Sequence, residues 1–397
     1  MMNRGSQMRG VDLPQLRSER LERLQAAMRK RGIAACLLTQ PMNVRYATGT
    51  AIMTVYGLGY FFRCTLVFAE GQPILYEHNN SKHLTEPIVE DVRPMLWDWE
   101  FSGDDAMPWA HEWALEIRGA LRERGVVGEK IALDRLTTPG FLALQNLGIE
   151  LIDSGPVMLE ARMVKTPEEV HAFRVNGPLI EQMLENMEAA IVQGVRENEL
   201  LATLTDTLLR GGGEFQITRG VEVGANTNPW RTEASDLAAA DGDLVWVDTD
   251  VNGIEGYFFC VSRTFLCGDG QPSPQQKEAY RAAHEYVTQA SELLRPGTSF
   301  WEFAEKVPRF PEKYQAQRYE VLGHSVGLED EGPSFPYADE EPPSVDHVLE
   351  ENMVMVIEGY FGEVGARDGV KLGDQYLITK DGPERLVNYP FEQRLLS

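Results

Sequence analysis

The second half of the chain places several acidic side chains and one histidine within segments of otherwise apolar or small residues. Asp248 and Asp250 lie two residues apart along a probable strand, so both side chains point to the same face. Glu358 lies in the apolar run M-V-M-V-I-E-G-Y, where an unpaired buried carboxylate would cost several kcal/mol. His324 follows the strand-like segment Y-E-V-L-G. The pattern predicts strands that bring these side chains into one polar site.

The order and spacing of these residues resemble those of the pita-bread metallopeptidase superfamily, which includes methionine aminopeptidase, prolidase and creatinase. The positions that carry the resemblance are Asp248, Asp250, Cys260, His324, Glu358 and Gly373. In that family the corresponding side chains are carboxylates and one histidine, and they hold two metal ions. Hard divalent cations need carboxylate oxygens, both as ligands and to balance their charge. Because Cys260 and Gly373 replace two of the carboxylates, we expect a degenerate site with no metal and no other cofactor.

The length of 397 residues is sufficient for two domains. Helical and strand-like segments alternate up to about residue 160, and a new helix is predicted with Thr166 as its N-cap and Pro167 as its first residue. We predict the α/β (α+β) class, with domains 1–160 and 161–397. The resemblance implies an N-terminal creatinase-like α/β domain and a C-terminal pita-bread domain of duplicated helix and antiparallel-strand halves.

The net charge of -24 disfavours nucleic acid and anionic membranes as partners, because phosphate binding requires basic groups. No apolar stretch approaches the 18 residues of a membrane span, and no apolar segment follows the charges near the start of the sequence. The four cysteines show no C-x-x-C spacing, which is typical of reduced core thiols rather than disulfides or a zinc site. These features predict a cytoplasmic protein.

The segments T-N-P-W, D-T-D and G-L-E-D are similar to those of two groups within the superfamily, the dimethylsulfoniopropionate lyases and the ectoine hydrolases. The lyases need metal ligands at the positions of Cys260 and Gly373, whereas the ectoine hydrolases resemble metal-free creatinase. The resemblance therefore implies a hydrolase of non-peptide carbon–nitrogen bonds that opens the cyclic amidine ectoine to N-acetyl-2,4-diaminobutyrate. The sequence leaves open whether 5-hydroxyectoine is also a substrate.

In this interpretation Glu255 is the nucleophile or general base, His324 moves protons, and Glu358 completes the catalytic set. Substrate contacts are expected from Asp250, Asp330, Trp230, Tyr257, Phe61 and Arg63. The F-x-R spacing of the last two resembles a creatinase segment that enters the active site of the partner subunit, which implies a homodimer with shared sites. The alternatives are a solvated strand arginine, and plain core positions for the aromatic residues.

Three other functions stay open. The first is a metal-dependent lyase or aminopeptidase that uses the surviving ligands Asp248, Asp250, His324 and Glu358. The second is a pseudoenzyme that binds its ligand without turnover. The third is a peptide-binding module, for which the sequence shows no clear basic or apolar patch.

Overall fold

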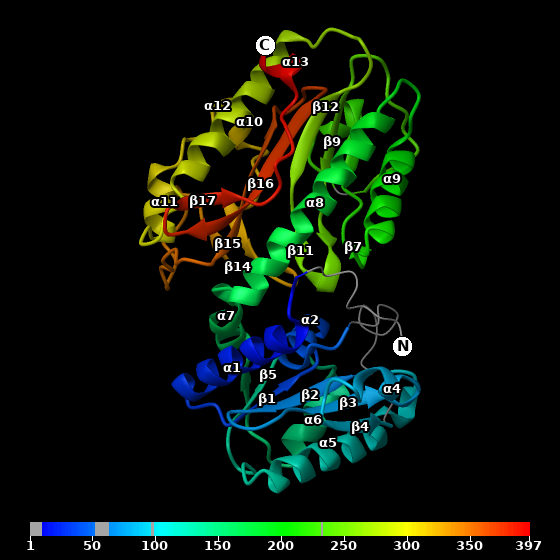
Figure 1. The fold of residues 1–397 in the computed structure, drawn as a ribbon, viewed down its shortest axis with the longest axis vertical. Helices are drawn as coiled ribbons and strands as arrows, with labels where there is room; N and C mark the ends of the chain where they lie inside the picture. The colour runs from blue at the N-terminus through cyan, green and yellow to red at the C-terminus, as the bar shows by residue number, and fades with distance from the viewer. Residues whose placement is uncertain (1–9, 52–62, 97–98, 232) are drawn as a thin grey trace. The chain divides into compact units, whose positions relative to one another are not determined.

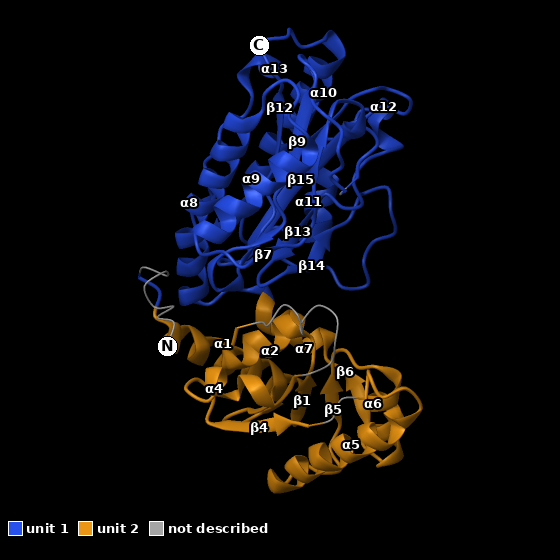
Figure 2. Cartoon of the chain, turned by 90° about the vertical axis from the view of Figure 1, so that its right-hand side faces the viewer, with its two compact units in different colours: residues 1–11, 163–397 blue, residues 12–162 orange. Residues whose placement is uncertain are grey.

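The computed structural model describes residues 10–51, 63–96, 99–231 and 233–397. Two compact units make up the chain, one of residues 12–162 and one of residues 1–11 and 163–397 (Figure 2). The division falls at the end of helix α7 (Gly155–Met163), and the predicted boundary between residues 160 and 161 lies in the same helix. Both units combine helices with sheets, which confirms the predicted α/β class.

The unit of residues 12–162 contains a six-stranded mixed sheet with the strand order β4-β3-β2-β1-β5-β6. Its strands are β1 (Ala35–Leu38), β2 (Cys64–Phe68), β3 (Ile74–His78), β4 (Asp91–Met95), β5 (Ile131–Leu133) and β6 (Leu151–Asp153). Its helices, besides α7, are α1 (Leu13–Arg31), α2 (Pro41–Thr48), α4 (Lys82–Thr85), α5 (Ala106–Glu123) and α6 (Thr138–Asn146). Trp113 of α5 packs in the core against Trp99, with ring centroids 5.1 Å apart.

The other unit is built around an antiparallel eight-stranded sheet with the order β14-β13-β15-β16-β12-β9-β8, in which β17 pairs with β16 (Figure 1). Its strands are β8 (Val221–Val223), β9 (Leu244–Asp248), β12 (Ser262–Leu266), β13 (Gly323–Val326), β14 (Asp330–Phe335), β15 (Val354–Gly362), β16 (Gly369–Thr379) and β17 (Gly382–Arg385). A three-stranded antiparallel sheet is formed by β7 (Phe215–Gln216), β10 (Val251–Asn252) and β11 (Phe258–Phe259).

The helices of this unit are α8 (Pro167–Ala190), α9 (Glu197–Arg210), α10 (Pro274–Glu292), α11 (Phe300–Lys306), α12 (Glu312–Gln315) and α13 (Gln393–Leu396). Helix α8 begins where the sequence predicts. The Thr166 hydroxyl accepts from the Glu169 amide at 3.3 Å, and the Glu169 carboxylate accepts from the Thr166 amide at 3.0 Å. This reciprocal capping box satisfies two amides that the helix itself leaves without partners.

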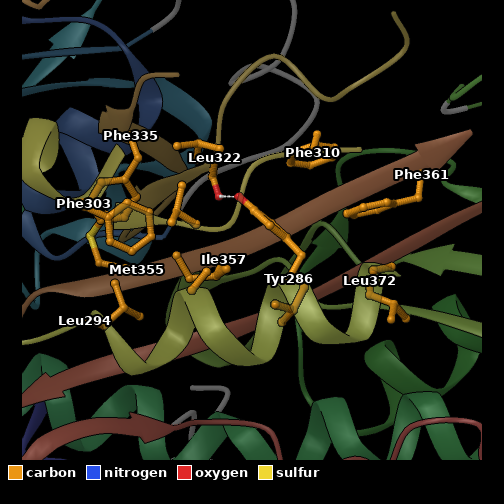
Figure 3. Packing of buried hydrophobic residues seen from close by; sticks show 14 of the residues in the cluster. Tyr286, Leu294, Phe303, Phe310, Leu322, Phe335, Met355, Ile357, Phe361 and Leu372 are labelled. Carbon is orange, nitrogen blue, oxygen red and sulfur yellow. Dashed lines mark hydrogen bonds between the residues drawn. The ribbon is translucent and has the colours of Figure 1, made fainter. Parts of the chain in front are cut away.

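The core between α10 and the large sheet determines which face of β15 and β16 remains for polar groups. Ile357 and Phe361 of β15 and Leu372 of β16 pack with Tyr286 of α10 in this core (Figure 3). Because side chains alternate along a strand, the residue after Ile357, Glu358, projects from the opposite face. The same alternation on β16 turns the residues on either side of Leu372 to that opposite face. The apolar core thus leaves Glu358 and the two neighbours of Leu372 on the other side of the sheet.

None of the helices in the described ranges has the length and apolar character to cross a bilayer. All four cysteines carry buried free thiols, as the sequence predicts.

Candidate active site

The pairing register of four neighbouring strands places the site residues in one row. Glu358 of β15 lies opposite Gly373 of β16, Gly373 lies opposite Ser262 of β12, and Ser262 lies opposite Asp248 of β9. His324 of β13 joins the row from the other side of β15, where it is paired with Val356. Residues more than 100 positions apart in sequence therefore meet on one face of the sheet.

The polar atoms of these residues form two overlapping groups. Cys260, His324 and Glu358 present ligand-type atoms within 4.8 Å of one another, and so do Asp248, Asp250 and Cys260. The Cys260 sulfur lies 3.5 Å from Asp248 Oδ1 and 3.9 Å from Glu358 Oε2, and so links the two groups. The structure thus brings together the acidic, imidazole and thiol groups that the sequence assigns to the degenerate site.

Lys371 is the functional residue that the sequence reasoning missed. Its side chain is fully buried, and its Nζ contacts Glu358 Oε2 and lies 3.4 Å from Asp248 Oδ2. The same ammonium lies 3.7 Å from the centre of the Tyr319 ring and 5.8 Å from that of Trp230. A usable signal was present, because Lys371 precedes Gly373 by two residues and so shares its face of the strand.

His324 lies between two carboxylates. Its Nε2 is 3.3 Å from Glu358 Oε1, and its Nδ1 is 2.8 Å from Asp330 Oδ1 and 3.0 Å from the carbonyl oxygen of Ser325. Burial by itself would lower the pKa of His324, but hydrogen bonds and charge from Asp330 and Glu358 outweigh it and raise the pKa well above the usual value. The geometry therefore favours an imidazolium that can donate a proton.

The carboxyl groups of the site differ in their environment. Burial raises the pKa of Asp250, and the negative charges of Asp248 and Glu358 raise it further. Burial would also raise the pKa of Glu358, but the charges of Lys371 and His324 reverse the effect and lower it. Neighbouring carboxyl groups with opposite pKa shifts are typical of sites that perform acid–base catalysis.

The sequence predicts one strand through Asp248 and Asp250, but β9 ends at Asp248, and Asp250 has a left-handed backbone conformation with φ 34°. Its Oδ2 accepts a hydrogen bond from Thr218 Oγ1 at 2.9 Å. Non-glycine residues rarely adopt positive φ, and such conformations occur preferentially where the chain must present a functional side chain. The backbone at this position thus aims the carboxyl group towards Asp248 and Cys260, with which it forms one of the two groups described above.

Glu255, the expected nucleophile or base, lies in a turn beside the smaller sheet. It occupies the short η5 turn (Ile254–Gly256) between β10 and β11 of the three-stranded sheet, with φ 57°. Among the described residues it belongs to neither group of ligand-type atoms. Its catalytic role stays a prediction.

Besides Asp250, three of the expected substrate contacts lie in the same unit. Asp330 bonds His324 and leaves 59% of its side chain exposed, so it lies at the open side of the site. Trp230 packs edge-on against Tyr319 with ring centroids 5.3 Å apart, and it is 36% exposed. Tyr257 is instead fully buried against Phe173 of α8, at a centroid distance of 4.8 Å, which is the environment of a core residue. Solvent can therefore reach Asp330 and Trp230 but not Tyr257.

The expected contribution of a partner subunit concerns the other unit. Phe61 lies outside the described residues. The Nε atom of Arg63 is 2.9 Å from Oε2 of the buried Glu77, and its Nη1 donates to the Ala51 carbonyl at 2.8 Å. Within this unit the arginine charge already has a carboxylate partner, and its contact with substrate stays a prediction.

Comparison with known proteins now identifies the family. Residues 172–380 match Metallopeptidase family M24, and residues 20–164 match the Creatinase/Prolidase N-terminal domain. The chain belongs to metallopeptidase family M24. Within M24 it is 33% identical over 394 residues to dimethylsulfoniopropionate lyase DddP of Roseovarius nubinhibens, which covers 97% of this chain and 88% of the lyase. It is 24% identical over 411 residues to the ectoine hydrolase of Halomonas elongata, which covers 96% of this chain and 98% of the hydrolase.

The M24 fold is also found in solved structures. The prolidase from Pyrococcus horikoshii OT3 superimposes with a TM-score of 0.74 at 22% identity, covering 94% of this chain and 99% of that protein. This likeness confirms the expected creatinase-like and pita-bread architecture. The relatives include a lyase, a hydrolase and a prolidase, so membership of M24 identifies an enzyme family without selecting a reaction.

The M24 family implies a metal, but the residues present here do not fit a pair of divalent cations. Cys260 and Gly373 supply no carboxylate, and the ammonium of Lys371 already contacts both Glu358 and Asp248. An ion on these oxygens would meet a fixed like charge in a buried environment, where Coulomb repulsion is weakly screened. The chemistry proposed for the site therefore uses its side chains, with no step through a metal.

Proposed function

We propose that this M24 protein is a metal-independent enzyme that acts on a small zwitterion carrying a delocalised cation and a carboxylate. The specific reaction we propose is the hydrolytic ring opening of the cyclic amidine ectoine. The observation that carries the proposal is the position of His324 between Glu358 and Asp330, because a charged imidazolium beside an acidic site can protonate a leaving nitrogen. The exposed sides of Asp330 and Trp230 offer a negative and an aromatic surface to a cationic substrate.

The proposed chemistry uses the charge of the substrate. The amidinium carbon of ectoine lies between two nitrogens and is electrophilic without a Lewis acid. A water oxygen adds to this carbon while a carboxylate takes its proton, and the carbon–nitrogen bond to one ring nitrogen then breaks. That nitrogen leaves with the bonding electron pair and receives a proton from His324. The hydroxyl proton of the adduct passes to the neutral imidazole as the carbonyl forms, which gives an acetamide and a free amine.

We propose Asp250 as the carboxylate that takes the proton from water, with Glu255 as the competing candidate. Asp250 shares a group of ligand-type atoms with Asp248 and Cys260, whereas Glu255 lies in the η5 turn of the smaller sheet. Direct attack by the carboxylate, with a transient ester, uses the same residue and is distinguished by mass spectrometry of the protein during turnover.

A second candidate is supported by the comparisons. The 33% identity to the lyase extends over nearly the whole chain, compared with 24% for the ectoine hydrolase. Elimination from a sulfonium zwitterion would also need a carboxylate base, which would remove the proton next to the substrate carboxylate. The carbon–sulfur bond would then break and the sulfide would leave with the electron pair, without water as a reactant.

The test is to incubate protein dialysed against EDTA with ectoine and, separately, with dimethylsulfoniopropionate, and to follow both by proton NMR. We expect a new acetamide methyl signal from ectoine, lost in His324→Asn and Asp250→Asn but retained in Glu255→Gln. If the acetamide signal is lost in Glu255→Gln and retained in Asp250→Asn, Glu255 rather than Asp250 takes the proton from water. Turnover of the sulfonium compound alone would establish the lyase, and turnover of neither would refute both proposals.

The predicted homodimer is tested with the same protein. The variants Arg63→Ala and His324→Asn should each be inactive, and a mixture of the two should recover part of the activity if each site contains groups from both subunits. A monomer in analytical ultracentrifugation would exclude shared sites.

A further inference from the structure

The side chain of Lys371 lies where the carboxylates of the site converge, and the proposed function assigns it no role. We propose that Lys371 is a resident cation that takes the place of divalent metal in this M24 site. Its ammonium binds the same oxygens, those of Glu358 and Asp248, that a metal would require. The inference holds for whichever substrate the enzyme accepts.

The strand register shows why a lysine can perform this role. Gly373 lies between Glu358 and Ser262 in the row across the sheet, and Lys371 is two residues away on the same face. A Cβ atom at position 373 would lie 3.0 Å from the Cβ of Glu358 and 3.2 Å from Ser262 Oγ. These contacts are tighter than ordinary packing. The neighbouring atoms therefore leave little room for a side chain at position 373. The positive charge in the row comes from Lys371.

The surroundings of the ammonium are those of a built cation site. A fully buried lysine is stable only when its charge is compensated, because desolvation of an unpaired ammonium is costly. Compensation comes from Glu358, from Asp248 at 3.4 Å, and from the face of the Tyr319 ring at 3.7 Å. Asp248 is fixed in turn by the Ser262 hydroxyl, which donates to its Oδ1 at 2.9 Å.

The inference predicts what removal of the ammonium would do. In Lys371→Ala the carboxylates of Asp248 and Glu358 would lose their cation, while the imidazole of His324 and the thiol of Cys260 would remain within reach. Carboxylate, imidazole and thiolate are ligands that Zn²⁺ accepts, and a smaller side chain leaves space for the ion. The variant should therefore acquire a metal site that the parent lacks.

The chain offers a matched control. Lys165 is also almost fully buried, with 1% of its side chain exposed, and it pairs with Glu331 at 3.2 Å. The Lys165→Ala variant therefore removes a buried lysine from its carboxylate without changing any of the groups that face Lys371. An effect shared by both variants would reflect general loosening of the fold, whereas an effect confined to Lys371→Ala would reflect the site.

The experiment measures the binding of Zn²⁺ and of Mn²⁺ to the protein in the absence of substrate. The parent and both variants are stripped with EDTA, dialysed, checked for folding by circular dichroism, and titrated by calorimetry, with bound metal counted by plasma mass spectrometry. We expect the parent and Lys165→Ala to hold no stoichiometric metal, and Lys371→Ala to bind one Zn²⁺ at least about a hundredfold more tightly.

Two results would overturn the inference. One is stoichiometric metal in the parent protein, which requires no variant and so decides the matter even if Lys371→Ala does not fold. The other is a folded Lys371→Ala that binds Zn²⁺ no better than the parent. Failure of the ectoine assay would not affect the metal content of the parent or the Zn²⁺ binding of the variant, because neither measurement includes a substrate.

Discussion

Replacement of Lys371 by Met and of Asp248 by Asn, singly and together, measures how strongly the buried ammonium and carboxylate depend on each other. Methionine keeps most of the volume of the lysine side chain and removes its charge. Asparagine likewise keeps the shape of aspartate. The double variant therefore removes both charges with little change in packing, so the cycle isolates the electrostatic interaction.

The expected magnitude follows from the geometry. At the observed 3.4 Å between Lys371 Nζ and Asp248 Oδ2, Coulomb's law with an effective dielectric constant of about 20 gives about 5 kcal/mol. Loss of Lys371 alone leaves Asp248 and Glu358 buried without their shared cation, and should lower the free energy of unfolding by about 3–5 kcal/mol. Loss of the Asp248 charge should cost less, because Lys371 keeps Glu358. The double variant should be at least about 2 kcal/mol more stable than the sum of the single losses predicts.

The assay must report on the unit that holds the site, because the chain contains two compact units. Urea unfolding followed by hydrogen exchange and mass spectrometry meets this need, with peptides from β15 and β16 as reporters. All measurements are made in EDTA, so that a metal bound by the lysine variant cannot restore stability. The Lys165→Ala protein again shows the cost of losing a buried lysine elsewhere.

Two outcomes would refute the reasoning. Losses of free energy that add within about 0.5 kcal/mol would show that the ammonium and the Asp248 carboxylate are independent. A Lys371→Met protein as stable as the parent would show that Asp248 and Glu358 need no cation between them.

Three further predictions concern stability. Burial, with the charge of Glu197, raises the pKa of Glu222 from 4.5 to about 9. Its protonated form therefore stabilises the fold fully below about pH 4.5, and this stabilisation is lost as the pH rises to about 9. Thermal scans of Glu222→Gln should therefore show a smaller decline across that window, and an unchanged decline would contradict the assignment. Asp374→Asn removes the carboxylate that lies 2.6 Å from buried Arg263, and should lower the free energy of unfolding in urea titrations by about 3–5 kcal/mol. A loss below about 1 kcal/mol would contradict this prediction. Thr166→Ala removes the N-cap of α8 and should cost about 1 kcal/mol, while Thr166→Ser keeps the hydroxyl and should stay near the parent.

Local signals in the sequence were sufficient for several features of the fold. The start of α8 at Thr166 and Pro167 follows from the chemistry of capping and from the fixed φ of proline, which depend on adjacent residues alone. Glu358 could be recognised as a site residue because a carboxylate in an apolar strand is unfavourable without a partner. The order of the acidic and histidine segments then indicated the family and hence the architecture.

Other features required the pairing of distant strands. The sequence shows only that Lys371 shares a strand face with Gly373, and its contact with Glu358 appears only when β16 is placed between β15 and β12. Glu255 shows the opposite case. It lies five residues from Asp250 in sequence, but the chain between them turns into the smaller sheet. Separation along the chain therefore did not determine which sheet holds each carboxylate.

The sequence by itself determined the family, the two-unit organisation and the loss of two metal ligands, because these depend on residue identity and order. Tertiary structure alone placed the ammonium that we propose takes the place of metal. The ammonium of Lys371 meets Glu358 and Asp248 only because three strand pairings set one register across the sheet. A charge acts over a few ångströms, and the distances between residues far apart in sequence are set by the packed sheet rather than by the chain.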